Sequence, residues 1–333
     1  MKRLLWLITL ILVVGSSPAI SQSTWIRQQS GTLAWLHAVY FVNSNTGWIG
    51  GAGGTLLKTA DGGNSWRTLS KPTEDSIHDI HFRDEQNGWL LCERDMFKLR
   101  TAEESGNYIL RTEDGGATWR RIGLGGSEGQ SRLVRFAFSE NGKAWIFGEA
   151  GTLLKSEDYG ETWKKQPLVT RFLLLGADFA SPKQGCVVGA GVTIIHTVDG
   201  GSTWQPGTTI DRLSHVRFNS VSFPNELFGW IVGDSGRIYA TIDGGKSWSP
   251  QDSKVDVDLR DVKFKTSLEG WAAGTEGTLL HTTDGGRNWR TESTGTRHPL
   301  DRVFAASPQR VWAVGFGGVI LAYTVGADRP KLR

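Results

Sequence analysis

A short acidic motif recurs six times in this sequence of 333 residues, and its carboxylates are the first groups that could do chemistry. Each copy has the form Ser/Thr-x-Asp-x-Gly-x-Ser/Thr/Asn-Trp, known as the Asp box, and the copies centre on Asp61, Asp114, Asp158, Asp199, Asp243 and Asp284. Calcium prefers roughly six to eight oxygen ligands, so one carboxylate per copy falls short of a cation site. We interpret the motif as a hairpin turn, in which the Asp accepts backbone N–H bonds and the glycines adopt positive φ.

Histidine and tyrosine could also act in catalysis, but their spacing indicates no metal or catalytic site. His78 and His81 fall in one predicted strand, where side-chain alternation puts them on opposite faces. His196 and His281 share the repeat position of Lys58, just before the Asp box. The glycine-rich stretches lie in hairpins with no helix after them, unlike a phosphate-binding loop. We therefore predict no catalytic residue, no metal ligand and no cofactor.

Arginines are the third group of candidate residues, and they gather at or just before the first strand of successive repeats. They are Arg132, Arg135, Arg171, Arg212, Arg217, Arg260, Arg297 and Arg302. Guanidinium groups pair with carboxylates in a planar, two-bond geometry, so a cluster of them would form a docking surface for acidic groups. The alternative is solvated charge, partly paired with Asp211, Asp258, Asp261 and Asp301. The formal net charge is only +3, so an electrostatic role depends on clustering.

A sevenfold repeat is the element that would bring these arginines together. The unit Gly-Trp-x-x-Gly, or a close variant, begins at Gly47, Gly88, Ala144, Gly185, Gly229, Gly270 and Val311, with spacings of 41, 56, 41, 44, 41 and 41 residues. An alternating apolar strand precedes each unit, and an apolar triplet followed by the Asp box comes after it. Four strands in about 41 residues are typical of a β-propeller blade. In a propeller, the linkers between blades meet around the mouth of the central channel, so the arginines would converge there.

The two ends of the repeat array complement each other. The seventh repeat ends with the strand Val319 to Leu321 and has no Asp box, whereas Ser23-Thr24-Trp25 matches the last three residues of one. Pairing the N-terminal strand with the last strand would close the ring and leave no exposed strand edge. The sequence thus predicts an all-β, seven-bladed β-propeller of four-stranded antiparallel blades over residues 22–326, closed by the N-terminal strand, with a tail at 327–333.

The N-terminus has the pattern of a signal peptide. Lys2 and Arg3 precede the apolar run 4–14, and small residues follow it up to Ser21, where we expect cleavage. The run is too short to span a bilayer. We therefore expect an exported protein, soluble after removal of residues 1–21. Cys92 and Cys186 fall in repeats separated by a whole blade, so we expect two free thiols rather than a disulfide.

The second repeat contains the one large insertion, at 93–107. It includes Met96, Phe97 and Leu99 among charged residues, in a loop that belongs to the mouth face. Long loops in compact domains are usually functional or disordered. Two interpretations stay open for it: a finger that contacts a partner, or disorder.

The sequence resembles the photosystem II stability/assembly factor family in four features taken together. These are the signal segment, the seven Gly-Trp units, the mouth arginines and the Asp boxes, such as Gly277 to Trp289 and Gly151 to Trp163. The resemblance covers nearly the whole chain after the signal segment. It implies a non-enzymatic scaffold of the thylakoid lumen or periplasm. Such a scaffold binds a membrane-protein complex subunit, which is a photosystem II reaction-centre polypeptide in a photosynthetic organism. Carried over by position, the implied partner-binding residues are Arg132, Arg171, Arg217, Arg260 and Arg297, with Arg302 beside them.

We expect a monomer that binds no nucleic acid, and contact with a membrane surface stays open. The alternative function is a secreted glycan-binding or glycan-hydrolysing propeller of the sialidase type, which also carries Asp boxes. Such hydrolases need paired carboxylates about 5 to 9.5 Å apart, or a Tyr nucleophile in sialidases. An enzyme would show paired carboxylates inside the channel, and a scaffold would show arginines there.

Overall fold

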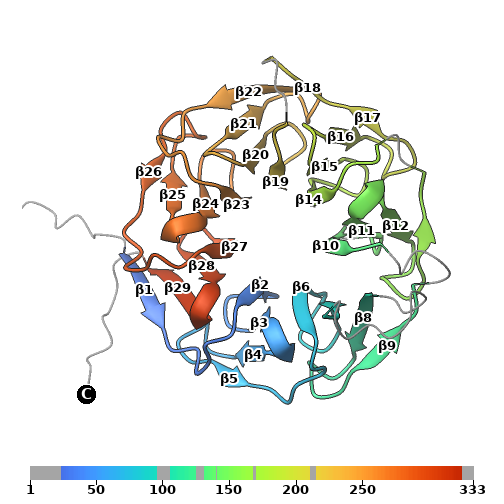
Figure 1. The fold of residues 1–333 in the computed structure, drawn as a ribbon, viewed down its shortest axis with the longest axis vertical. Helices are drawn as coiled ribbons and strands as arrows, with labels where there is room; N and C mark the ends of the chain where they lie inside the picture. The colour runs from blue at the N-terminus through green and yellow to red at the C-terminus, as the bar shows by residue number, and fades with distance from the viewer. Residues whose placement is uncertain are drawn as a thin grey trace, which may run out of the picture.

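The computed structural model describes residues 24–95, 106–124, 131–139, 141–167, 170–210 and 215–324. Seven β-sheets stand side by side around a central channel, as the blades of a β-propeller (Figure 1). The predicted fold class is therefore confirmed. The expected signal peptide 1–21, the tail 327–333, residues 96–105 of the insertion and Arg212 lie outside the described residues. No helix among the described residues is long and apolar enough to cross a membrane.

Each blade is an antiparallel sheet whose first strand lines the channel. Blade 1 contains β2 (Leu36–Phe41), β3 (Gly47–Gly51), β4 (Leu56–Thr59) and β5 (Arg67–Thr68), and blade 2 contains β6 (Ser76–Phe82), β7 (Gly88–Glu93), β8 (Asn107–Thr112) and β9 (Arg120–Ile122). Blade 3 contains β10 (Leu133–Phe138), β11 (Ala144–Gly148), β12 (Leu153–Ser156) and β13 (Lys164–Lys165).

Blades 4 to 6 repeat this order. Blade 4 contains β14 (Leu174–Phe179), β15 (Gly185–Gly189), β16 (Ile194–Thr197) and β17 (Gln205–Pro206), and blade 5 contains β19 (Phe218–Ser222), β20 (Gly229–Gly233), β21 (Ile238–Thr241) and β22 (Ser247–Gln251). Blade 6 contains β23 (Leu259–Phe264), β24 (Gly270–Gly274), β25 (Leu279–Thr282) and β26 (Arg290–Thr291). The short strand β18 (Thr208–Thr209) pairs in parallel with the outer strand of blade 5, an addition that the repeat did not predict.

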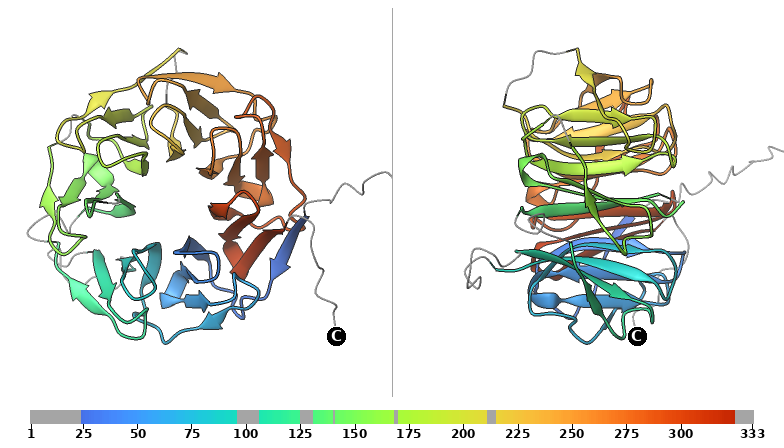
Figure 2. Two further views of the ribbon diagram at one scale, coloured as in Figure 1. Left: turned by 180° about the vertical axis from the view of Figure 1, so that it is seen from behind. Right: turned by 90° about the vertical axis from the view of Figure 1, so that its right-hand side faces the viewer.

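Blade 7 is built from both ends of the described chain, as the split Asp box predicted. It contains β27 (Leu300–Ser307), β28 (Arg310–Gly315), β29 (Val319–Thr324) and, as outer strand, β1 (Thr24–Gln28). The two ends of the described chain meet at the ring's outer edge, where β1 lies beside β29 (Figure 2). The two strands are antiparallel, with Trp25 opposite Tyr323. Their rings lie 5.3 Å apart between centroids. This pairing closes the ring and covers the edge of β29.

Tryptophans of the Gly-Trp units join neighbouring blades. Trp48 stacks on Phe82 of blade 2 with ring centroids 3.6 Å apart, and Trp230 stacks on Phe264 of blade 6 at the same distance. In blade 4 the position belongs to Cys186, which lies in the apolar cluster around Phe223. Cys92 and Cys186 are free and buried, and burial raises the pKa of both thiols. The expectation of two free thiols is confirmed.

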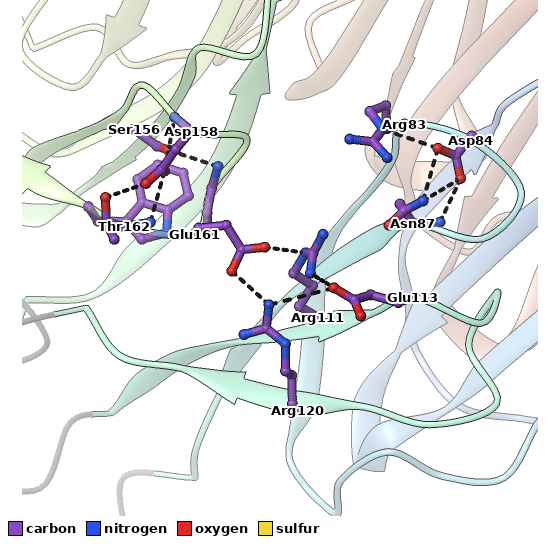
Figure 3. Close-up of polar contacts among 12 residues, drawn as sticks. Arg83, Asp84, Asn87, Arg111, Glu113, Arg120, Ser156, Asp158, Glu161 and Thr162 are labelled. Atoms are coloured by element: carbon purple, nitrogen blue, oxygen red, sulfur yellow. Dashed lines mark hydrogen bonds and ion pairs between the residues drawn. The ribbon is translucent and has the colours of Figure 1, made fainter.

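The Asp boxes are hydrogen-bonded turns at the far end of each blade from the mouth. In the blade 4 copy, Oδ1 of Asp199 accepts the backbone N–H groups of Ser202 and Thr203, both at 2.9 Å, and Oδ2 accepts the Thr203 hydroxyl at 2.6 Å. These bonds hold the pKa of Asp199 at about 2. Each turn also reaches the preceding blade: Glu161, in the blade 3 copy, pairs with Arg111 at 2.8 Å and with Arg120 at 2.7 Å, both from blade 2 (Figure 3). The carboxylates of the motif are thus structural.

The innermost strand of every blade carries a β-bulge at the same repeat position. The strand pairing skips one residue in each case: His37, His78, Val134, Leu175, Asn219, Arg260 and Asp301. A bulge leaves its extra residue out of the ladder and re-aims its side chain. All seven of these residues line one cavity at the channel mouth. The bulge therefore brings one side chain from each inner strand to the channel mouth.

Candidate functional site

The mouth of the channel forms a cavity of about 340 Å³, here named the mouth cavity. Its lining consists of the seven bulged residues together with Arg132, Arg135, Arg217, Asp258 and Arg302. Five arginines from blades 3, 5, 6 and 7 therefore face two lining carboxylates, Asp258 and Asp301. Each of these arginines also pairs with a carboxylate: Arg132 with Glu93, Arg135 with Asp261, Arg217 with Asp234, Arg260 with Asp301 and Arg302 with Asp79. The expected alternative of paired charge is thus seen at Asp261 and Asp301.

Four of the six arginines expected to bind a partner lie in this cavity: Arg132, Arg217, Arg260 and Arg302. Arg171 and Arg297 are exposed and do not line it. Both stand three residues before the first buried residue of their inner strand, which places them further out on the mouth face. The structure thus brings most of the expected residues together and leaves two of them outside the cavity.

Arg132 and Arg217 are the most exposed arginines of the cavity, with side chains 45% and 48% exposed. Nε of Arg132 donates to both carboxylate oxygens of Glu93 at 3.1 Å, and Nε of Arg217 donates to Asp234 at 3.5 Å. Within the described part of the chain, the terminal nitrogens of these two guanidinium groups have no hydrogen-bond partner. Each group is therefore oriented through Nε, with its outer edge available for a second carboxylate.

The floor of the cavity consists of ion pairs that also join blades. Arg135 contacts Asp261 at 3.1 Å and Arg302 contacts Asp79 at 3.4 Å. The other oxygen of each carboxylate accepts a backbone N–H from the next blade: Phe136 N–H donates to Asp79 at 2.8 Å, and Val303 N–H donates to Asp261 at 2.9 Å. Burial raises the pKa of Asp79 to about 6, although Arg135 and the Phe136 N–H oppose the shift. Burial likewise raises the pKa of Asp261.

Below this floor the channel continues as a cavity of about 570 Å³. Its lining includes aromatic side chains, among them Tyr40, His81 and Phe304, and one further ion pair, Lys263 with Asp178 at 3.4 Å. Asp178 also accepts the Phe223 N–H of the next blade at 2.8 Å. Asp79, Asp178 and Asp261 therefore play the same role at different blades: each ties its inner strand to the next one.

The residues that sequence reasoning missed are two histidines at the bulge position. The rings of His37 and His78 are stacked with centroids 4.8 Å apart. His37 contacts Asp301 at 3.3 Å and His78 contacts Glu93 at 2.9 Å. Both carboxylates also hold an arginine of the cavity, Arg260 and Arg132 respectively. The two histidines are 41 residues apart, one repeat spacing, but they face the mouth only because of the bulge.

His78 and His81 stack on different neighbouring blades: His78 on His37 of blade 1, and His81 on Phe138 of blade 3 with ring centroids 3.8 Å apart. His78 lines the mouth cavity and His81 lines the channel beneath it. The described residues contain no group of three or more His, Cys, Asp or Glu side chains that could hold a metal ion. The site presents two exposed guanidinium groups, Arg132 and Arg217, each oriented by a carboxylate at Nε.

Comparison with known proteins gives a family for this chain. A family model described as photosynthesis system II assembly factor YCF48 matches residues 64–173, 168–254 and 249–324. The photosystem II assembly lipoprotein Ycf48 of Synechococcus sp. (strain CC9902) is 29% identical over 168 residues, which is 48% of this chain and 45% of that protein. The photosystem II assembly protein Ycf48 of Synechococcus sp. (strain JA-2-3B'a(2-13)) is 25% identical over 174 residues, 51% of this chain and 48% of that protein. The matches therefore span about half the length of these curated relatives.

Solved structures share the fold. A structure titled "YCF48 bound to D1 peptide" superposes with a TM-score of 0.73 at 21% identity, over 93% of this chain and 100% of that one. A GH74 xyloglucanase from Xanthomonas campestris superposes with a TM-score of 0.68 at 14% identity, over 93% of this chain and 55% of that one. At these identities the likeness shows the fold alone. The family model, in contrast, covers most of the sequence, and the chain belongs to the family of photosynthesis system II assembly factor YCF48.

Proposed function

We propose that this protein is a non-enzymatic scaffold of photosystem II assembly that receives an acidic segment of a reaction-centre polypeptide in its mouth cavity. Family membership supports the assembly role. A structural neighbour with the same fold is described as bound to a D1 peptide, which supports a reaction-centre polypeptide as the partner class. The protein would be exported, as its N-terminal pattern predicts. It would act as a monomer in the thylakoid lumen or the periplasm.

The observation that carries this proposal is the convergence of arginines from four blades on one cavity. Arg132 and Arg217 are held through Nε, so their free edges are fixed in direction before a partner arrives. Such preorganisation lowers the entropy cost of binding. Asp258 and Asp301 in the lining then limit which acidic segments fit, because a misplaced carboxylate meets a like charge. The proposed binding residues are Arg132, Arg217, Arg260 and Arg302, with Arg171 and Arg297 guiding the segment from the rim.

The channel carboxylates support a scaffold rather than a glycan hydrolase. A glycosidase needs one carboxylate as acid and a second as nucleophile or base, both facing the substrate. Three channel carboxylates each accept a backbone N–H of the next blade and pair with a cationic side chain: Asp79, Asp178 and Asp261. Carboxylates engaged in this way are parts of the fold.

The test is direct binding of a D1 peptide to the purified protein, measured by fluorescence anisotropy. Reversing the charge of the two exposed cavity arginines, Arg132→Glu with Arg217→Glu, should weaken binding at least about 100-fold, since each lost charge-assisted pair is worth roughly 1.5–3 kcal/mol. The matched control is Arg287→Glu with Arg290→Glu, which makes the same charge change at two exposed positions near the blade 6 Asp box.

If both double variants weaken peptide binding equally, the effect comes from the net charge of the protein, and the mouth cavity is not the binding site. Failure of the wild-type protein to bind any D1 peptide would remove reaction-centre polypeptides as the partner. Thermal unfolding of each variant checks that the fold is intact.

A further inference from the structure

The mouth face is not equally cationic all the way round: the cavity lining takes arginines from blades 3, 5, 6 and 7, and none from blades 1, 2 and 4. Backbone contacts define equivalent positions: the carbonyl oxygens of Trp35, Arg132 and Arg217 accept the N–H of Ala52, Glu149 and Asp234, at 2.8, 2.8 and 3.1 Å. These three residues therefore stand at the same place in blades 1, 3 and 5. Blade 1 has a tryptophan at this place, where blades 3 and 5 present the most exposed arginines of the cavity. The same backbone contact places Leu173, Asp258 and Pro299 there in blades 4, 6 and 7.

A second position shows the same replacement. Leu33 stands three residues before the first buried residue of its inner strand, as Arg171 does in blade 4 and Arg297 in blade 7. Leu33 is 87% exposed, the largest value among the exposed hydrophobic residues. Both positions, each of which holds an arginine in two other blades, are therefore apolar in blade 1.

The neighbouring turn of blade 7 adds a third apolar group. Phe316, in the short 3-10 turn η6 (Phe316–Gly318), is 43% exposed. The corresponding turns begin with small or polar residues: Ala52, Glu149, Ala190, Asp234 and Thr275. Gly318 N–H donates to the Ala34 carbonyl at 2.8 Å, which fixes this turn against blade 1. The rings of Trp35 and Phe316 meet edge to face at 5.3 Å.

Leu33, Trp35 and Phe316 form what we name the apolar corner, and it is continuous with the mouth cavity. The guanidinium of Arg260 lies 5.7 Å from the centre of the Trp35 ring, and the Trp35 and His37 rings are 5.4 Å apart. Arg260 and His37 both line the cavity. Leu33 also lines a hollow of about 350 Å³, together with Gly317, Gly318 and residues 27–32.

We propose that the apolar corner is an anchor site for an apolar side chain of the same acidic segment that docks in the mouth cavity. This inference rests on the proposed function and deepens it, because it states the partner's chemistry: an amphipathic segment with a carboxylate and, along the chain from it, a leucine-sized or aromatic residue. Charge alone leaves a segment free to bind in either direction across a ring. An apolar contact at one point of the rim fixes its direction and register.

The experiment uses the full protein and short fluorescent peptides of Glu, Gly and Ser, in which single serines are replaced in turn by Phe. The all-polar parent peptide tests charge capture by itself. In the wild-type protein, one Phe position should tighten binding about tenfold over the parent, as expected for partial burial of an aromatic side chain. In the variant Leu33→Ser with Phe316→Ser, binding of the parent should stay the same and the gain from Phe should vanish.

Phe172→Ser is the matched control, because Phe172 is 55% exposed on the mouth face of blade 4, away from the apolar corner. It should keep the full gain. The inference is overturned if no Phe position tightens binding, or if the gain survives in the Leu33/Phe316 variant. Absence of binding by every acidic peptide would instead overturn the proposed function, and the inference with it.

Two other occupants of the apolar corner, a second copy of this chain or a lipid surface, would give different experimental results. If sedimentation shows a wild-type dimer that the Leu33/Phe316 variant converts to a monomer, the corner is a contact between copies of this chain. If the variant loses binding to anionic phospholipid vesicles that the wild type retains, the corner contacts lipid. Either result overturns a peptide anchor.

Discussion

Aspartate has two different roles in this protein, and its hydrogen-bond partners decide which one. In the Asp boxes an exposed carboxylate accepts several N–H and O–H bonds, so its charged form is favoured, as the pKa of about 2 for Asp199 shows. In the channel, Asp79 is buried and its pKa rises to about 6 even with arginine beside it. The first environment uses the charge to fix a turn, and the second accepts the cost of a buried charge in order to join two blades.

Replacing Asp199 by alanine should destabilise the protein by about 1 to 2 kcal/mol, because a turn loses its charge-assisted acceptor. The loss should depend on pH. Because the pKa in the folded state lies below the ordinary value of 3.8, the stabilisation is present above that value and is lost as the pH falls toward 2. Urea unfolding of wild type and Asp199→Ala at several pH values measures this difference. A difference that stays constant down to pH 2 would contradict the assigned role of the ionised carboxylate.

At the scale of elements, the ring is closed by a single outer strand. β1 contributes Trp25, which is buried with Tyr323 in the core cluster of blade 7, whereas its neighbour Ile26 is 44% exposed. Closure leaves no open edge on β29, the last strand of the described chain. The closure of the ring therefore depends on the buried face of β1, a strand of five residues.

Trp25→Ala should destabilise the protein by about 3 to 5 kcal/mol, as large aromatic truncations in a core do. Ile26→Ala in the same strand should cost well under 1 kcal/mol, because its side chain remains largely in water. Thermal unfolding of both variants tests the pair. Similar melting temperatures for the two would show that β1 does not close the ring in solution.

At the scale of the whole molecule, seven similar blades produce an uneven mouth. Arginines from blades 3, 5, 6 and 7 line the cavity, while blade 1 and the turn of blade 7 present Leu33, Trp35 and Phe316. The formal net charge of the chain is only +3, so the proposed attraction for an acidic segment depends on the arginines of the cavity. The mouth of a sevenfold repeat is thus uneven in charge and polarity because equivalent positions of the blades hold different residues.

Salt should separate the two contributions to binding. Raising the ionic strength from about 0.01 M to 1 M shortens the Debye length from roughly 30 Å to 3 Å, so exposed charge pairs weaken. Binding of an all-polar acidic peptide should fall by at least tenfold over this range. The extra affinity given by an apolar residue should stay nearly constant, because burial of apolar surface is not screened. Anisotropy titrations at several salt concentrations measure both, and a salt-independent affinity for the acidic peptide would argue against capture by arginine.

The sequence by itself determined the fold of this protein: Gly-Trp units at near-constant spacing predict the blades, six Asp boxes predict the turns, and Thr24-Trp25 predicts which strand closes the ring. These features are local or periodic, so a linear chain displays them directly. It also placed Arg132, Arg217, Arg260 and Arg302 near the mouth. Only the tertiary structure decided which side chains share the cavity, because the bulge at His37, His78 and Arg260 reverses the alternation of a regular strand. It likewise decided that Phe316 lies against Trp35, since the two come together only when the ring closes.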